Sequence, residues 1–141
     1  MVWSCLVSIL PGMAQTEKLT DYVNPFVGTD GYGNVYPGAQ IPFGGIQISP
    51  DTDSRFYDAA SGYKYNHLTL MGFSLMHLSG TGIPDLGDFL FIPGTGEMKL
   101  EPGTHEDPDQ GYRSRYSHDK EWASPNYYAV ELADYGVKAE M

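Results

Sequence analysis

The stretch Tyr128-Ala-Val-Glu-Leu-Ala-Asp-Tyr-Gly-Val-Lys-Ala-Glu-Met141 decides the fold class. Tyr128, Val130 and Leu132 alternate with small or charged residues, which is the two-residue period of a strand with one buried face. Asp134-Tyr-Gly136 then supplies turn residues, and the alternation resumes after it. The stretch therefore predicts a β-hairpin. Because the alternation runs to the last residue without a closing turn, we expect the domain to be cut short there.

Other parts of the chain carry further strand signals. Leu68–Leu75 is mostly apolar, and the shorter apolar run Asp88–Ile92 is closed by a proline. Residues 23–53 are punctuated every few positions by turn-forming Asn, Asp, Gly and Pro, with an extended piece at Gly45–Ser49. No stretch carries a sustained 3.6-residue apolar period, so helices should be few and short. We therefore predict an all-β domain, an antiparallel β-sandwich.

Charge narrows the range of partners. The chain has 141 residues, enough for one domain with a core, and carries 18 Asp and Glu against 8 Lys and Arg, a formal net charge of −10. Such a surface repels phosphate backbones and anionic membranes, which argues against nucleic acid as a partner. A neutral ligand such as a sugar meets no such repulsion.

Residues 1–14 have the pattern of a signal peptide. Val2–Leu10 is apolar and uncharged, and Gly12 and Ala14 are the small residues of a cleavage site, although the usual positive n-region is missing. A short buried strand is the alternative, and the run is too short to span a bilayer. We therefore expect export to the periplasm, the outer surface or the medium, with the domain at 15–141 and no membrane span.

The loop His77-Leu-Ser-Gly-Thr-Gly-Ile-Pro-Asp-Leu-Gly-Asp88 concentrates groups that can bind a sugar. Its glycines let the backbone approach a ligand, and its short carboxylates can accept hydrogen bonds from vicinal hydroxyls. The glycine spacing excludes a Rossmann or P-loop site. The alternative is structural, with the carboxylates bound to turn amides and the histidine hydrogen-bonded under the sheet. The candidate binding residues of the loop are His77, Gly80, Thr81, Asp85 and Asp88.

Aromatic residues precede this loop. Tyr57 and Tyr63 are candidate binding residues because sugars stack their C–H faces on aromatic rings, with packing as the alternative role. The run His105–Asp109 contains metal-ligand residue types, but an acidic surface turn with a proline explains it better. We therefore predict no metal site in this chain.

Short segments along the chain form a further pattern. They are Tyr22-Val-Asn-Pro-Phe-Val-Gly-Thr29, Pro37-Gly-Ala-Gln-Ile-Pro-Phe-Gly44, Gln47-Ile-Ser-Pro-Asp51, Ser61-Gly-Tyr63, Gly72-Phe-Ser74, His77-Leu-Ser-Gly-Thr-Gly82, Gly87-Asp88, Ser117-His118 and Ala123-Ser-Pro125. In this order they resemble the N-terminal domain of glycoside hydrolase family 92, the calcium-dependent exo-α-mannosidases. Leu75-Met76 and Ala60 depart from many relatives, which have His-Thr and Cys at these places.

The resemblance implies a two-domain enzyme in which this β-sandwich packs on an (α/α)6 barrel. Family members remove terminal α-linked mannose from glycans with inversion, using one carboxyl group as acid and another as base. In the family the acid, the base and the calcium ligands belong to the helical domain. The resemblance therefore implies no catalytic residue and no metal ligand in this chain, which would shape one wall of the substrate cleft and be inactive by itself.

Two other interpretations remain for the function. A stand-alone carbohydrate-binding β-sandwich would also suit a neutral ligand and an aromatic-rich surface, although such a module should close its sheets. An inactive gene fragment would share the ancestry of the mannosidases without their activity.

Overall fold

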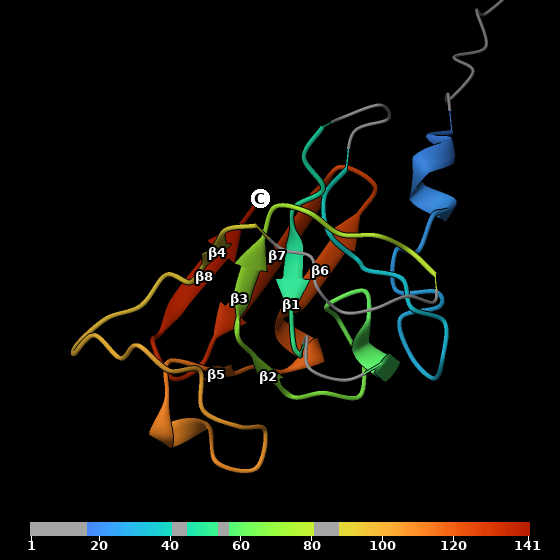
Figure 1. The fold of residues 1–141 in the computed structure, drawn as a ribbon. Coiled ribbons are helices and arrows are strands. Elements are labelled where there is room, and N and C mark those ends of the chain that lie inside the picture. Colours follow the sequence, from blue (N-terminus) through green and yellow to red (C-terminus); the bar gives the residue numbers. More distant parts are fainter. Residues whose placement is uncertain (1–16, 41–44, 54–56, 81–87) are drawn as a thin grey trace, which may run out of the picture.

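The computed structural model describes residues 17–40, 45–53, 57–80 and 88–141, and Figure 1 shows its fold. Within these residues the helical elements are all short 3₁₀ turns, and the strands pair antiparallel. The prediction of an all-β, antiparallel fold is confirmed. The 3₁₀ turns are η1 (Leu19–Tyr22), η2 (Tyr57–Ala59), η3 (Pro108–Gln110) and η4 (His118–Lys120). The strands are β1 (Ser49–Asp51), β2 (Thr69–Leu70), β3 (Gly72–Ser74), β4 (Leu90–Phe91), β5 (Ser114–Arg115), β6 (Glu121–Ser124), β7 (Tyr127–Leu132) and β8 (Val137–Glu140).

The predicted C-terminal hairpin is formed by β7 and β8. Leu132 pairs with Val137 next to the turn, and β6 joins the other edge of β7 to give a three-stranded sheet in the order β6-β7-β8. β8 alternates as predicted, with Ala139 buried between the exposed Lys138 and Glu140. In β7, Tyr128, Ala129 and Val130 are all fully buried, so the prediction of one buried face is wrong for this central strand, which is covered on both faces there.

The predicted apolar strand at 68–75 is divided in the structure. β2 pairs with β5, whereas β3 pairs with β1 and β4 in a second three-stranded sheet. The division falls at Met71, and the next residue, Gly72, has a φ of 154°; a Cβ atom on Gly72 would lie 2.7 Å from the carbonyl oxygen of Phe91. A glycine thus lets the chain change sheets while β4 lies close against it. β4 is an edge strand, and its Leu90 and Phe91 are exposed.

The two three-stranded sheets lie in different layers with the core between them (Figure 1). Buried side chains from β2, β3, β7 and β8 meet there in a single cluster. Fully burying one large apolar side chain contributes about 1.5–3 kcal/mol to the free energy of unfolding. The cluster is Leu70, Phe73, Tyr116, Tyr128, Val130, Leu132 and Ala139.

A buried carboxylate at the start of β6 links the layers. The side chain of Glu121 is 1% exposed, and its oxygens accept hydrogen bonds from the hydroxyls of Tyr63 at 3.0 Å and Tyr128 at 2.5 Å. Nδ1 of His118 lies 2.6 Å from the same carboxylate, and the His118 ring stacks on Tyr65. Several donors together make a buried carboxylate tolerable. Burial, reinforced by the charge of Glu121, raises the pKa of the Tyr128 phenol.

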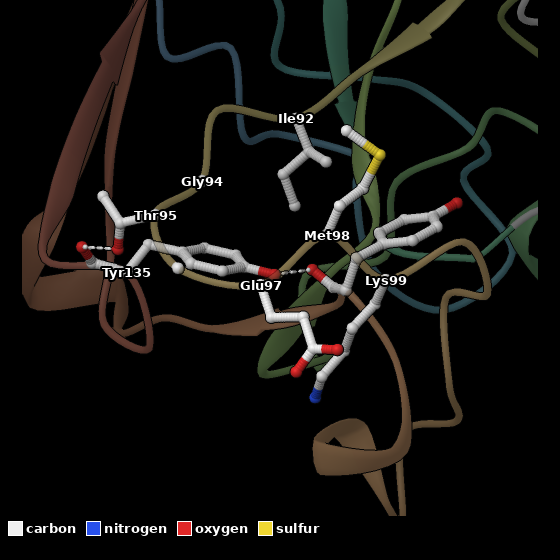
Figure 2. Close-up of a pocket in the computed structure, with 9 residues that line it drawn as sticks. Ile92, Gly94, Thr95, Glu97, Met98, Lys99 and Tyr135 are labelled. Carbon is white, nitrogen blue, oxygen red and sulfur yellow. Dashed lines mark hydrogen bonds between the residues drawn. The ribbon is translucent and has the colours of Figure 1, made fainter.

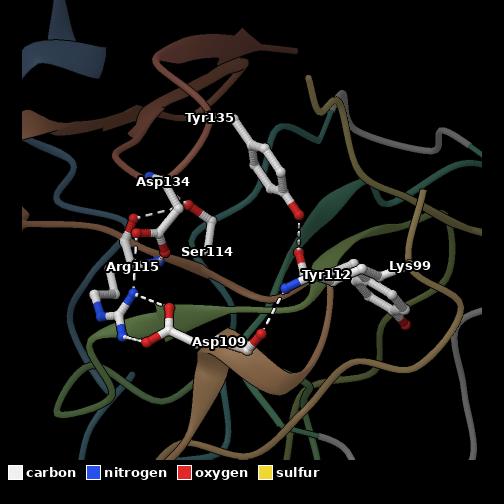
Figure 3. Close-up of polar contacts among 7 residues, drawn as sticks. All are labelled: Lys99, Asp109, Tyr112, Ser114, Arg115, Asp134 and Tyr135. Atoms are coloured by element: carbon white, nitrogen blue, oxygen red, sulfur yellow. Dashed lines mark hydrogen bonds and ion pairs between the residues drawn. The ribbon is translucent and has the colours of Figure 1, made fainter. Parts of the chain in front are cut away.

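On the surface, Arg115 connects β5 to two neighbouring turns, as Figure 3 shows. Its guanidinium donates to both carboxylate oxygens of Asp109 at 2.8 Å, and to Asp134 at 3.0 Å. The backbone N–H of Arg115 also donates to Asp134, at 2.7 Å. Arg115 holds the pKa of the Asp109 carboxyl below its ordinary value through this bidentate contact.

We expect the free energy of unfolding to fall as the pH rises above about 10, the ordinary pKa of tyrosine. Burial raises the pKa of Tyr63, Tyr116 and Tyr128, so above that pH the unfolded chain holds fewer protons than the folded one. Urea unfolding across the alkaline range measures the effect. An unfolding midpoint that stays constant through this range contradicts the assignment of these phenols to the core.

Candidate functional site

A hollow of about 340 Å³ forms where sequence-distant loops meet, and we call it the loop hollow. Its volume lies within the range of about 300–1,000 Å³ that is typical of small-molecule sites. Most of its lining belongs to the short segments that carry the family resemblance. The lining residues are Val23, Pro25, Tyr36, Gly38, Gln40, Ser79 and Pro125.

The stretch from residue 34 to residue 40 forms one side of the loop hollow. Its ends are tied to other loops, because the N–H of Gly80 donates to the carbonyl of Asn34 at 2.6 Å and the N–H of Gln40 donates to the carbonyl of Pro125 at 3.3 Å. Within the stretch, the hydroxyl of Tyr36 donates to Oε1 of Gln40 at 2.9 Å. These bonds hold an aromatic ring and an amide side by side in the wall.

A buried histidine–aspartate pair lies against the ring of Tyr36. The His77 ring is 5.0 Å from the Tyr36 ring, and His77 Nε2 is 2.9 Å from Oδ1 of Asp51. His77 Nδ1 is 2.7 Å from the carbonyl oxygen of Gln47, and the N–H of Ser74 donates to the other Asp51 oxygen at 2.9 Å. Since a carbonyl oxygen only accepts, Nδ1 is the donor to Gln47. Both nitrogens of His77 are thus engaged within the protein.

The segment Ser61-Gly-Tyr63 packs against this pair through its backbone. Gly62 has a φ of 87°, and a Cβ atom there would lie 2.2 Å from Oδ1 of Asp51 and 3.1 Å from Nε2 of His77. Only glycine combines this backbone conformation with so close an approach. Gly62 therefore connects the Ser-Gly-Tyr segment to the wall of the loop hollow.

The structure places two of the predicted binding residues next to the lining of the loop hollow and buries a third in the core. Gly80 directly follows Ser79, which lines the hollow, and the His77 ring lies 5.0 Å from the ring of Tyr36, another lining residue. Tyr63 is 1% exposed, and its hydroxyl donates to Glu121. Their proposed role in sugar binding stays a prediction.

The other predicted binding residues lie elsewhere or outside the described part of the chain. Tyr57 lies in η2 and is 58% exposed, and Asp88 is exposed just before β4 with a φ of 55°. Thr81 and Asp85 are outside the described residues, as is the predicted signal peptide at 1–14. Their roles also stay predictions.

Tyr36, Gln40 and Asp51 were not predicted as site residues. The sequence signal available for them is their position in, or directly beside, the segments Pro37–Gly44 and Gln47–Asp51. The contact between Gln40 and Pro125 joins loops far apart in the chain, which a single sequence does not reveal.

A second hollow, of about 230 Å³, lies beside the loop that follows β4 (Figure 2). The hydroxyl of Tyr135 donates to the carbonyl of Tyr112 at 2.7 Å, and Thr95 Oγ1 donates to the carbonyl of Tyr135 at 3.2 Å. Nζ of Lys99 donates to the carbonyl of Asp109 at 2.5 Å. Because these polar groups already bind within the protein, the second hollow is the weaker candidate.

The acidic run His105–Asp109, predicted as a surface turn, overlaps η3. His105 Nε2 is 3.1 Å from Asp53 Oδ2, and Nδ1 is 2.8 Å from Oγ1 of Thr69. Among the described residues, no group of three His, Cys, Asp or Glu side chains is arranged to hold a metal ion. No helix within the same residues is long and apolar enough to cross a membrane.

The fold and the loop hollow define a β-rich domain in which sequence-distant loops meet around a hollow large enough for a small molecule. A family model described as the glycosyl hydrolase family 92 N-terminal domain matches residues 22–141, and the chain therefore belongs to this family. The resemblance read from the short segments is confirmed.

Solved and curated relatives agree with this assignment. The structure of the family GH92 α-mannosidase BT3965 from Bacteroides thetaiotaomicron, in complex with mannoimidazole, is 99% identical over 89% of this chain, with a TM-score of 0.86. The GH92 family glycosyl hydrolase ccman5 is 33% identical over 80% of the chain, with a TM-score of 0.65. An uncharacterized secreted glycosidase of Arthroderma benhamiae is 32% identical over 122 residues, 85% of the chain. The chain spans only 16%, 14% and 15% of these proteins, respectively.

The close approach of Gly62 to the histidine–aspartate pair makes a testable prediction. Gly62→Ala should lower the free energy of unfolding by about 3 kcal/mol or more, because a methyl group there must displace Asp51 from His77. Gly96→Ala is the matched control, since Gly96 has the same φ of 87° and nothing within 4 Å of its Cβ position. Strain alone should cost that control about 1–2 kcal/mol. Equal losses in urea unfolding would exclude the proposed contact.

Proposed function

We propose that this chain is the N-terminal domain of an exported α-mannosidase and forms one wall of its substrate cleft. The observation that carries the proposal is the 99% identity to a GH92 α-mannosidase solved with mannoimidazole bound. The neutral character of a mannoside also suits a chain with a net charge of −10. The substrates would be glycans with terminal α-linked mannose.

In this proposal the reaction belongs to a second, helical domain, an (α/α)6 barrel that is this domain's partner. That domain would supply an acid that protonates the leaving oxygen and a base that activates water from the opposite face, with inversion. It would also hold the calcium ion, since the described residues of this chain offer no suitable ligand group. Calcium would help to position the sugar and the water there.

The loop hollow has groups suited to a sugar. Tyr36 lines the hollow, and aromatic rings can stack against the C–H groups of a sugar. The hydrogen bond from Tyr36 to Oε1 holds the Gln40 amide, whose NH₂ group can donate to a hydroxyl. Ser79 adds a hydroxyl to the wall. An aromatic ring beside neutral polar groups is the composition expected of a carbohydrate site.

Export is part of the proposal. The signal peptide at 1–14 would direct the protein to the periplasm, the outer surface or the medium, leaving the domain at 15–141. The description of the Arthroderma benhamiae relative as secreted supports this.

The division of labour between domains can be tested with p-nitrophenyl α-mannoside. We expect the intact protein that contains this domain to hydrolyse it, to lose activity with a calcium chelator and to regain it when calcium is added. Residues 15–141 alone should show no turnover. Measurable turnover by residues 15–141 would overturn this division, and mannoside binding by a chain with no catalytic partner would favour a stand-alone binding module.

The amide of Gln40 provides a second test. Gln40→Ala should lower kcat/KM of the intact protein for α-mannosides about tenfold, equal to about 1.4 kcal/mol, because one hydroxyl contact and the support of Tyr36 are lost. Gln110→Ala, an exposed position in η3, is the control and should leave kcat/KM unchanged. Equal kinetics for the two variants would remove Gln40 from the site.

A further inference from the structure

His77 is a buried histidine whose two ring nitrogens both face hydrogen-bond partners within the protein. The residue is 2% exposed, and its Nδ1 donates to the carbonyl oxygen of Gln47 at 2.7 Å. Its Nε2 lies 2.9 Å from Oδ1 of Asp51 and 3.2 Å from Oγ of Ser74. With both nitrogens engaged, the imidazole has no polar atom left for a sugar hydroxyl. An effect of His77 on the loop hollow therefore has to pass through a neighbouring side chain.

The partners of His77 also fix the charge of its ring. A carbonyl oxygen only accepts, so Nδ1 carries a proton, and an ionised carboxylate likewise only accepts, so Nε2 carries one too. The other oxygen of Asp51 accepts from the N–H of Ser74 at 2.9 Å, which favours the ionised form of the carboxyl group. With Asp51 ionised, His77 is an imidazolium, and the two residues form a buried ion pair.

Tyr36 connects this ion pair to the wall of the loop hollow. The centroids of the Tyr36 and His77 rings are 5.0 Å apart, and the ring planes are inclined at 40°. A cation within about 6 Å of an aromatic centroid is attracted to the electrons of the ring. Tyr36 lines the hollow, and its hydroxyl donates to Oε1 of Gln40, which lines it as well. Tyr36 is thus held through its hydroxyl by Gln40 and through its ring by His77.

We propose that His77 is a positioning residue, an imidazolium that is anchored by Asp51 and holds the Tyr36 ring in the orientation that receives the mannoside. His77 acts on the sugar only through Tyr36, and Asp51 acts on Tyr36 only through His77. The inference rests on the proposed function. It gives the buried ion pair a role in substrate binding in addition to its role in the fold.

Combined substitutions in the intact protein test this role. His77→Asn removes the ring and its charge, and it should lower kcat/KM for p-nitrophenyl α-mannoside about fivefold or more. We expect the same loss in the Tyr36→Phe background, where the ring remains, and no further loss in the Tyr36→Ala background, where the ring is gone.

His105→Asn is the matched control. Nε2 of His105 is 3.1 Å from Oδ2 of Asp53, and its ring lies 4.0 Å from the ring of His67, so it also combines a carboxylate with a ring contact. His105 is not among the residues that line the loop hollow, and none of these contacts involves Tyr36. His105→Asn should therefore retain full kcat/KM.

The possible outcomes separate the inference from the function on which it rests. With an active wild type, full kcat/KM in His77→Asn overturns the inference and leaves the proposed function standing. So does a loss from His77→Asn that persists in the Tyr36→Ala background, or an equal loss in His105→Asn, because His77 would then not act through Tyr36. A wild type that neither hydrolyses p-nitrophenyl α-mannoside nor binds methyl α-mannoside in calorimetry overturns both.

A second variant covers the case in which His77→Asn does not fold. His77→Gln has a longer side chain whose amide can still donate to Asp51, and thermal melting shows whether it folds. If it folds, it replaces His77→Asn in the same combinations. If neither variant folds while Tyr36→Ala does, His77 serves the fold and not the Tyr36 ring, and the inference is overturned.

Discussion

The buried carboxylate of Asp51 is the constraint on which the site depends. It ends β1, accepts the N–H of Ser74 from β3, and contacts His77 Nε2 at 2.9 Å. A carboxylate that is 8% exposed is costly unless donors surround it, so its neighbours are held in narrow positions. Gly62 is the residue whose backbone can approach it at that distance. The His77 ring contacts the ring of Tyr36, which lines the loop hollow, so the position of Asp51 also affects the wall of the hollow.

Glu121 has the corresponding role for the packing of the two layers. Its hydrogen-bond partners come from the Ser-Gly-Tyr segment, from β7 and from η4, and two of them are tyrosines whose rings are buried. Tyr63 directly follows Gly62, so a single short segment touches both carboxylates. The core and the loop hollow are therefore coupled, and a change at Gly62 should affect stability and site geometry together.

The fold was largely predictable because strands have a local signature. The β7–β8 hairpin follows from side-chain alternation around a turn, which depends only on neighbouring residues. The division of the 68–75 run at Met71 was not predictable, since it depends on which strands pair with each half. Likewise, the apolar residues of β4 gave a strand signal, but their exposure depends on what packs beside them. The family resemblance came from short segments in order, which need no contact to be recognised.

By itself, the sequence determined the strand pattern, the net negative charge, the family and the segments that carry the family resemblance. Only the tertiary structure decided which residues of those segments meet. The N–H of Gln40 donates to the carbonyl of Pro125, and the carbonyl of Asn34 accepts from the N–H of Gly80. The residues of each pair are far apart in the chain, and nothing in the sequence indicates that they meet. The physical reason is that a strand depends on the alternation of neighbouring side chains, which the sequence shows directly. The wall of a hollow depends on hydrogen bonds between buried groups that are distant in the sequence and meet only in the folded chain.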